Sequence, residues 1–175
     1  MSERHADAGT PIRPPAGQYV LAGWWRRAGA QLVDGIIVGI GGVGLCIAIM
    51  APFSIGFFAG GDVGLASIFV GALIALICVS IVALLYAPAL MAHTNGRTLG
   101  RMATGIRVVR ATGEPFTFNF AMLREVAVKL LLFGIAGSIT GGLANLADYL
   151  WPLWDEQNRA LHDFVVDTRT VIDQP

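Results

Sequence analysis

Basic residues are missing from a long internal stretch of this 175-residue chain. No Lys or Arg lies between Arg27 and Arg97, and the only acidic residues there are Asp34 and Asp62. Charged residues make up 14% of the sequence and hydrophobic residues 55%, against about 25% and about 45–50% in an average soluble domain. A soluble domain of this size has too little interior to bury so much apolar surface. The composition therefore excludes an ordinary soluble domain and indicates an integral membrane protein.

Cysteine is scarce, and a net charge is absent. Cys46 and Cys78 both lie in apolar runs without Cys-x-x-Cys spacing, so we expect reduced thiols that pack as small hydrophobic side chains. The sequence shows no metal-ligand spacing and no plausible nucleophile triad. We therefore predict no cofactor, no metal and no enzymatic activity. A formal net charge of zero provides no long-range field to attract nucleic acid, so no nucleic-acid partner is predicted.

Two long apolar segments, residues 24–51 and 63–91, are the predicted membrane spans. Each exceeds the roughly 20 residues that a helix needs to cross the hydrocarbon layer. The loop between them has no Lys or Arg, whereas most of the Arg residues flank the other ends. Basic residues concentrate in short cytoplasmic segments, so we predict a multi-pass plasma-membrane protein with a cytoplasmic N-terminus. Residues 1–20 are predicted to be a disordered tail, and residues 21–173 one membrane domain.

The third apolar region, residues 118–154, leaves two topologies open. Two full crossings need about 40 residues, and a cluster of glycines interrupts the region. We favour a broken, re-entrant helical hairpin over a single crossing. Strand-forming segments at residues 105–110, 116–118 and 164–172 predict a small cytoplasmic β element. The predicted fold class is therefore an all-α integral membrane protein with two long transmembrane helices, a broken third region and this β element.

Asp34 lies near the middle of the first predicted span, about 15 Å beyond Trp24 along the helix axis. Trp24, Arg27, Gln31 and Asp34 share one helical face. A carboxylate at this depth costs roughly 2.5–3.5 kcal/mol, so it must be paired, hydrated or protonated. Arg27 and Arg124 are the expected partners. Asp34 is then either an ion or proton ligand, or half of a structural ion pair that sets helix packing.

Two polar residues of the third region extend this prediction. Asn145 and Asp148 lie one helical turn apart and are candidates for the same cluster, although we favour Asp148 as an interfacial carboxylate beside Tyr149 and Trp151. The predicted intramembrane polar cluster, a candidate ion-binding site, comprises Arg27, Gln31, Asp34, Arg124, Asn145 and Asp148.

His162 and Asp163 are candidates near the C-terminus. They can form a pH-sensitive pair. Alternatively, Asp163 caps or pins the cytoplasmic tail against Arg97 or Arg101, which we favour.

Four sequence motifs carry a resemblance to a known family. Residues 22–34, Ala-Gly-Trp-Trp-Arg-Arg-Ala-Gly-Ala-Gln-Leu-Val-Asp, resemble the opening of the RDD family of membrane proteins. Residues 95–101, Asn-Gly-Arg-Thr-Leu-Gly-Arg, are similar to the family's Gly-x-Thr-x-Gly-Lys/Arg step. Residues 105–109, Gly-Ile-Arg-Val-Val, are similar to the strand that follows it. Residues 157–163, Gln-Asn-Arg-Ala-Leu-His-Asp, are similar to the family's C-terminal His-Asp segment.

The resemblance covers roughly residues 22–172 and implies which residues matter. The family is named for one arginine and two aspartates, which the resemblance places at Arg27, Asp34 and Asp163. It also implies a cytoplasmic motif made of Arg97, Thr98, Gly100, Arg101, His162 and Asp163. Arg101 stands where Lys is usual, which keeps the charge but changes the donor geometry. A transporter-like or accessory membrane module is the implied function.

Two functions follow from these observations. The first is a small transporter or cation/proton exchanger that acts as an oligomer through the polar cluster, because two spans and a broken hairpin enclose little volume. The second is a non-enzymatic accessory or scaffold membrane protein that binds anionic lipid through its Arg-rich loop, or binds a larger membrane partner. For both we expect the lipid bilayer as a partner and a homo-oligomer or larger membrane complex.

Overall fold

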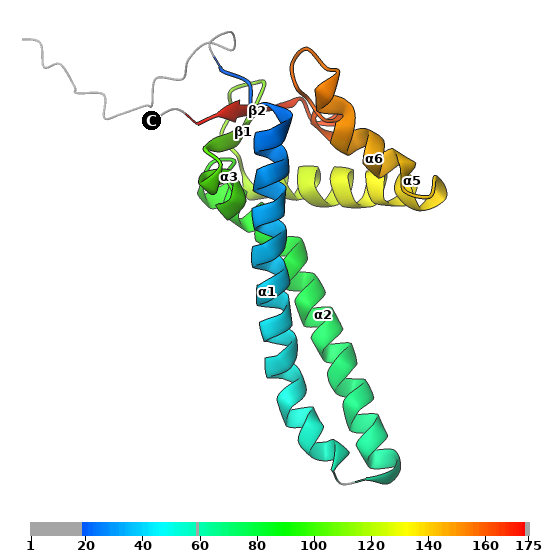
Figure 1. Cartoon of the computed structure of the whole chain (residues 1–175). Coiled ribbons are helices and arrows are strands. Elements are labelled where there is room, and N and C mark those ends of the chain that lie inside the picture. The colour runs from blue at the N-terminus through cyan, green and yellow to red at the C-terminus, as the bar shows by residue number, and fades with distance from the viewer. Residues whose placement is uncertain (1–18, 59, 174–175) are drawn as a thin grey trace, which may run out of the picture.

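One long helical hairpin forms the frame of the molecule. The computed structural model describes residues 19–58 and 60–173, with only the backbone described at residues 131 and 132. Helix α1 covers Trp24–Phe57 and helix α2 covers Gly61–His93. They pack side by side along the hairpin (Figure 1). The disordered tail was predicted over residues 1–20. Residues 1–18 of it lie outside the described residues.

Both helices extend beyond the predicted spans. They contain 34 and 33 residues, which corresponds to about 50 Å each, against about 30 Å for the hydrocarbon layer. The predicted loop over residues 52–62 is therefore wrong. Helix α1 continues through Pro52, and the connection is confined to residues 58–60. Neighbouring groups can satisfy the backbone that a proline frees in a membrane helix, so Pro52 does not end α1.

A small sheet closes the opposite end of the hairpin. Strands β1 (Ile106–Arg110) and β2 (Thr168–Ile172) pair antiparallel, with Val108 opposite Thr170. The segment before α1 joins β2: Ala22 N–H donates to Thr170 O at 3.0 Å, and Ile172 N–H donates to Val20 O at 2.8 Å. The residues before α1, the central loop and the C-terminal tail therefore meet at one end. This arrangement rules out the single-crossing alternative for residues 118–154, which would carry β2 to the far end.

Two of the three predicted strands need correction. Residues 116–118 form no strand, because Thr117 caps helix α4 (Phe118–Met122) by accepting a hydrogen bond from Phe120 N–H at 3.4 Å. The predicted strand over residues 164–172 shortens to β2, because helix α7 (Leu161–Val165) occupies its start. Asp167, with a φ of 47°, turns the chain between them.

The third apolar region is a broken helical hairpin, as favoured from the sequence. Helix α4, the π-helix η1 (Leu123–Leu132) and helix α5 (Phe133–Ile139) run on from one another and lie crosswise to α1 and α2 (Figure 1). Gly141 and Gly142 reverse the chain with φ values of 62° and 93°. Helix α6 (Leu143–Leu150) then returns along α5 and leads into the 3-10 turn η2 (Trp151–Leu153).

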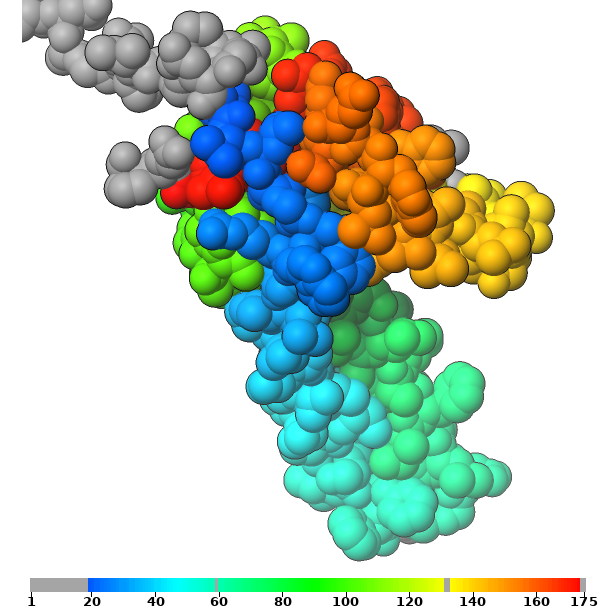
Figure 2. All heavy atoms as spheres, turned by 45° about the horizontal axis from the view of Figure 1, so that its top comes forward, coloured from blue at the N-terminus to red at the C-terminus, as the bar shows by residue number. Residues whose placement is uncertain are grey.

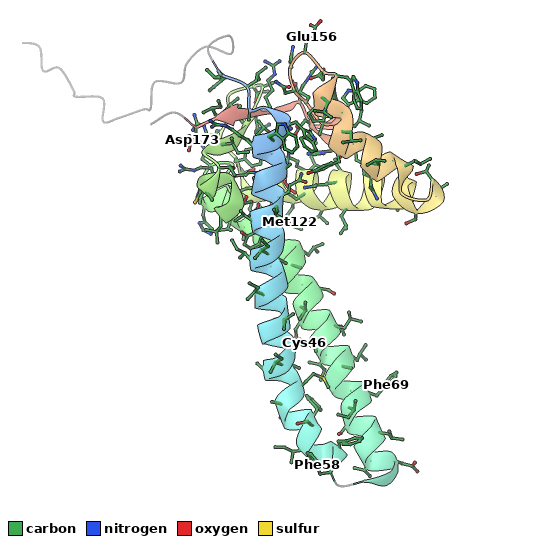
Figure 3. All side chains as sticks on the ribbon, viewed as in Figure 1. Cys46, Phe58, Phe69, Met122, Glu156 and Asp173 are labelled. Carbon is green, nitrogen blue, oxygen red and sulfur yellow. The ribbon has the colours of Figure 1, made fainter. Side chains whose placement is uncertain are left out.

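Apolar and polar surfaces separate along the molecule. Of the helices that the structure describes, α1 and α2 are the two long and apolar enough to cross a membrane, with mean hydropathies of 2.3 and 3.1 in their best windows. Phe58 lies at the tip of the hairpin, whereas Glu156 and Asp173 lie at the other end (Figure 3). We call residues 94–173 the headpiece. It packs around the first turns of α1 (Figure 2) and contains helix α3 (Leu99–Ala103).

Candidate functional site

Asp163 is the centre of a buried ion-pair network in the headpiece. Its side chain is fully buried and accepts hydrogen bonds from Arg27 Nη1 at 2.8 Å and Arg124 Nη2 at 2.6 Å. Thr168 Oγ1 and Ala160 N–H also donate to it, at 2.9 and 3.2 Å. Burial acts to raise the pKa of Asp163, but Arg124, His162 and Arg27 outweigh it and hold that pKa well below its usual range. One carboxylate therefore joins α1, η1, α7 and β2.

Glu125 is the second buried carboxylate of this network. It pairs with the adjacent Arg124, with Arg101 Nη2 at 3.2 Å and with Lys129 Nζ at 3.4 Å. Burial acts to raise the pKa of Glu125, but Lys129, Arg124 and Arg101 together hold it well below its usual value. Arg124 is itself only 2% exposed. It links the two carboxylates, so Glu125 and Asp163 belong to one network.

His162 connects this network to helix α6. Its Nδ1 lies 2.8 Å from Asp148 Oδ2, and its Nε2 lies 2.9 Å from Arg124 Nη2. The His162 backbone N–H also donates to Asp148 Oδ1 at 2.8 Å. A guanidinium has no acceptor, so His162 Nε2 must accept from Arg124 while Nδ1 donates to Asp148. In this arrangement the Nδ1 proton lies toward Asp148, and Nε2 faces the Arg124 guanidinium.

Asp34 does not belong to this network. Its carboxylate accepts from Tyr86 Oη at 2.8 Å, Thr98 Oγ1 at 2.5 Å and Gly100 N–H at 2.8 Å. These donors come from the end of α2 and the start of α3, so Asp34 holds α1 against both elements. Asp34 lies at the boundary between the hairpin and the headpiece, because its donors belong to the end of α2 and to the headpiece residues Thr98 and Gly100.

At Gly100, helix α3 lies close against the backbone of α1, beside Asp34. A Cβ added at Gly100 would lie 2.1 Å from Ala30 O and 2.8 Å from Asp34 Cγ. Any side chain there would push α3 away from α1 and break the hydrogen bond to Asp34. The packing therefore requires glycine at this position.

The predicted intramembrane cluster thus separates into distinct parts. Arg27 pairs with Asp163 and not with Asp34, while Asp148 is buried against His162 instead of lying at an interface beside Tyr149 and Trp151. Gln31 is exposed on α1 at the margin of the network. Asn145 is exposed on α6, where its side chain covers Gly137 of α5.

The predicted cytoplasmic motif is also divided. Thr98 and Gly100 bind Asp34, whereas Arg101 binds Glu125. Arg97 lies on the sheet side and pairs with Asp173 at 2.8 Å. The prediction that Asp163 pins the tail to Arg97 or Arg101 is wrong, because Arg27 and Arg124 occupy its oxygens.

Tyr86, Glu125 and Thr168 contribute to these contacts but were not among the predicted site residues. Glu125 had a visible signal, since it follows Arg124 directly inside an apolar region. Tyr86 and Thr168 had none, because a hydroxyl in a span or strand is ordinary in sequence. Only the tertiary fold brings them beside aspartates.

A small cavity adjoins the network. It has a volume of about 40 Å³ and lies where α1, η1, α6 and α7 meet. Its ionisable lining residues are Arg27, Asp34, Arg101, Arg124, Lys129, Asp148 and His162. Among the residues that the structure describes, no group of three His, Cys, Asp or Glu side chains is placed to hold a metal ion. The cavity is therefore bordered mainly by hydrogen-bond donors and carboxylates that are already paired.

These features define a class: a helical membrane protein whose two-helix hairpin carries a headpiece joined to it by buried ion pairs. The model of the RDD family matches residues 21–167, and the chain belongs to that family. It is 28% identical over 152 residues to the uncharacterized protein YckC of Bacillus subtilis (strain 168), which covers 86% of this chain and 83% of the relative. No solved structure matches the chain.

Proposed function

We propose that this protein is one subunit of an oligomeric, proton-coupled membrane transporter. The observation that carries the proposal is the position of His162 between Asp148 and Arg124. Histidine is the side chain whose ordinary pKa permits a charge change near neutral pH. Ionisable groups within membrane segments are frequent elements of ion and proton pathways, and the network around His162 reaches α1, one of the two candidate spans, through Arg27.

Proton uptake at His162 would reorganise the network. A proton on Nε2 would face the Arg124 guanidinium at 2.9 Å, donor against donor, so Arg124 must move. Asp163 Oδ1 lies 3.5 Å from Nε2 and can accept the new N–H. Asp163 also binds Arg27 of α1. The charged groups that surround the ring are Asp148 of α6, Arg124 and Glu125 of η1, Asp163 of α7 and Arg27 of α1. Protonation is thereby linked to the contact between the headpiece and a membrane helix.

A transport path requires more than one copy of the chain. Two helices enclose no path of their own, and α1 carries glycines where an added Cβ would have no neighbour within 4 Å: Gly35 and Gly39 on one helical face, and Gly41 and Gly44 on the opposite one. Small residues permit close approach of membrane helices, which supports contacts between copies through α1.

We further propose that the headpiece is cytoplasmic and the membrane is the plasma membrane, because the far end of the hairpin lacks Lys and Arg.

The test uses purified protein in proteoliposomes with an imposed pH gradient. We expect dissipation of that gradient on adding Na⁺ or K⁺, and loss of this coupling in His162→Gln. Glutamine can accept from Arg124 and donate to Asp148, so the fold should persist. His93→Gln changes an exposed histidine at the end of α2 and should retain full coupling. Absence of cation-dependent flux in the wild type, or unchanged coupling in His162→Gln, would refute the proposal.

A non-enzymatic accessory protein is the second candidate, and one observation favours it. Every carboxylate oxygen of Asp34, Glu125, Asp148 and Asp163 already accepts a hydrogen bond or ion pair. No free carboxylate of this set remains to bind a cation in the described conformation. This candidate predicts co-purification with a larger membrane partner and no flux in the proteoliposome assay. If no partner is recovered and flux is present, the accessory role fails.

A further inference from the structure

Arg27 has more hydrogen-bond donors than the chain uses. Its Nη1 binds Asp163, but Nε and Nη2 are buried and lack a hydrogen-bond partner within the described residues, 19–58 and 60–173. A buried N–H group without an acceptor is costly, and native structures seldom leave one unsatisfied. The guanidinium borders the cavity of about 40 Å³. Since a water-sized atom needs about 10–15 Å³ of such space, the cavity admits a group with more than one acceptor oxygen.

The surroundings of Arg27 select an anionic ligand. Arg101, Arg124 and Lys129 line the same cavity, and the carboxylate between them, Glu125, already receives ion pairs from all three. Asp34 and Asp148 also line the cavity, but their oxygens already accept hydrogen bonds. The polar atoms without a partner at the cavity are therefore the two donors of Arg27, Nε and Nη2. An oxyanion such as a phosphate group matches donors of this kind and forms charge-assisted hydrogen bonds with them.

An apolar groove continues from this site. Lys129 also borders a second cavity of about 260 Å³ between α2 and η1, whose other lining residues are Ala83, Leu84, Ala87, Glu125 and Leu130. Leu84 and Leu130 are 37% and 51% exposed. Ala83 and Leu84 belong to α2, one of the two membrane-spanning helices, so the groove opens toward lipid. A free phosphate would leave this groove unexplained, whereas an acyl chain fits it.

We propose that the chain binds an anionic phospholipid at this position. A phosphate oxygen accepts from Arg27 Nε and Nη2, Lys129 contacts the headgroup at the mouth of the cavity, and one acyl chain lies in the groove between α2 and η1. Lys129 is the link, because it borders both the cavity and the groove. The site is independent of transport, and a lipid-binding measurement tests it without a flux assay.

The experiment titrates delipidated protein in detergent with phosphatidylglycerol, phosphatidylcholine or inorganic phosphate, and measures binding by native mass spectrometry and thermal shift. We expect saturable one-to-one binding of phosphatidylglycerol, and weaker binding of the other two. Lys129→Gln should weaken phosphatidylglycerol binding roughly fivefold, the effect of one basic residue at a membrane surface. Ala87→Phe should weaken it by filling the groove while leaving the charges intact.

The control is Arg159→Gln, which removes a cation that pairs with Asp155 in a different part of the headpiece and should leave binding unchanged. Phosphate binding that weakens in Lys129→Gln but not in Ala87→Phe would identify free phosphate as the ligand and overturn the lipid proposal. Equal affinity for phosphatidylcholine, or no binding of phosphatidylglycerol, would also overturn it. If Ala87→Phe fails to fold, the comparison of phosphatidylglycerol with inorganic phosphate on the wild type still separates the two ligands, and Lys129→Gln, whose replaced side chain is 35% exposed, still tests the headgroup contact.

Discussion

At the residue scale, the two aspartates Asp34 and Asp163 have different electrostatic roles. Asp163 is compensated by two guanidinium groups in a fully buried site. Asp34 receives three neutral donors and no direct cation. Removing a partner from a buried ion pair leaves an uncompensated charge, which costs far more than losing one neutral hydrogen bond.

Asp163→Asn should therefore strongly destabilise the headpiece. Its amide cannot compensate Arg27 and Arg124, and we expect a loss of about 3–5 kcal/mol. Asp173→Asn is the matched control, because Asp173 is a partly exposed partner of Arg97 and Arg107 and should cost less than about 1 kcal/mol. Thermal unfolding in detergent measures both. Equal loss in the two variants would contradict the assigned role of Asp163.

Acid should weaken the same network. The folded-state pKa values of Asp163 and Glu125 are depressed, so their stabilisation is fully present above the unfolded-state values of about 4 and is lost as pH falls below them. We expect the unfolding temperature to drop between about pH 5 and pH 3. In Asp163→Asn this pH dependence should be shallower. An equally steep drop in that variant would show that Asp163 is not responsible.

At the scale of elements, close contacts to α1 hold the headpiece in place. Helix α3 approaches α1 at Gly100, and the residues before α1 extend the sheet beside β2. The π-helix η1 places Arg124 and Lys129, five residues apart, on the lining of one cavity. Its i→i+5 hydrogen bonding differs from that of an α-helix and is often found at functional sites.

Gly100→Ala tests the contact between α3 and α1. The added methyl group would meet Ala30 O at 2.1 Å, and overpacking of this kind costs about 1–3 kcal/mol. Gly134→Ala is the control, since a Cβ there has no neighbour within 4 Å and Ala favours a helix. Thermal unfolding should fall for Gly100→Ala and stay equal or rise for Gly134→Ala. An unchanged Gly100→Ala protein would mean that α3 is not pressed against α1.

At the scale of the whole molecule, the sheet determines the topology. Strands β1 and β2 come from opposite sides of residues 118–154 in the sequence, yet they pair over five residues. Both ends of that region must therefore return to the same end of the hairpin. Helices α5 and α6 expose large apolar residues, including Ile139 at 80% and Leu143 at 67%, on a part of the molecule that projects beside the hairpin (Figure 2).

Cysteine labelling in intact cells and in inside-out membrane vesicles tests this topology. In a Cys46→Ala, Cys78→Ala background, single cysteines at Glu114 and Glu156 should react with an impermeant maleimide from the same side of the membrane. A cysteine at Phe58, which is 86% exposed at the hairpin tip, should react from the other side. Labelling of Glu114 and Glu156 from opposite sides would contradict the paired sheet.

The sequence by itself determined the membrane class, the two long apolar helices and the approximate places of β1 and β2, because hydrophobic length and β-branched runs are local signals. It did not exclude a strand at residues 116–118 or show that α7 occupies residues 164–165. The resemblance to the RDD family singled out Arg27, Asp34 and Asp163 as candidates. Which of these residues pair was decided only by the tertiary structure. Spacing along α1 placed Arg27 near Asp34, but the folding of the headpiece around α1 carries Asp163, Arg124 and His162 to Arg27 and brings Tyr86, Thr98 and Gly100 to Asp34. Partners 52 to 136 residues apart leave no periodic trace in a sequence, because long-range contacts depend on how whole elements pack.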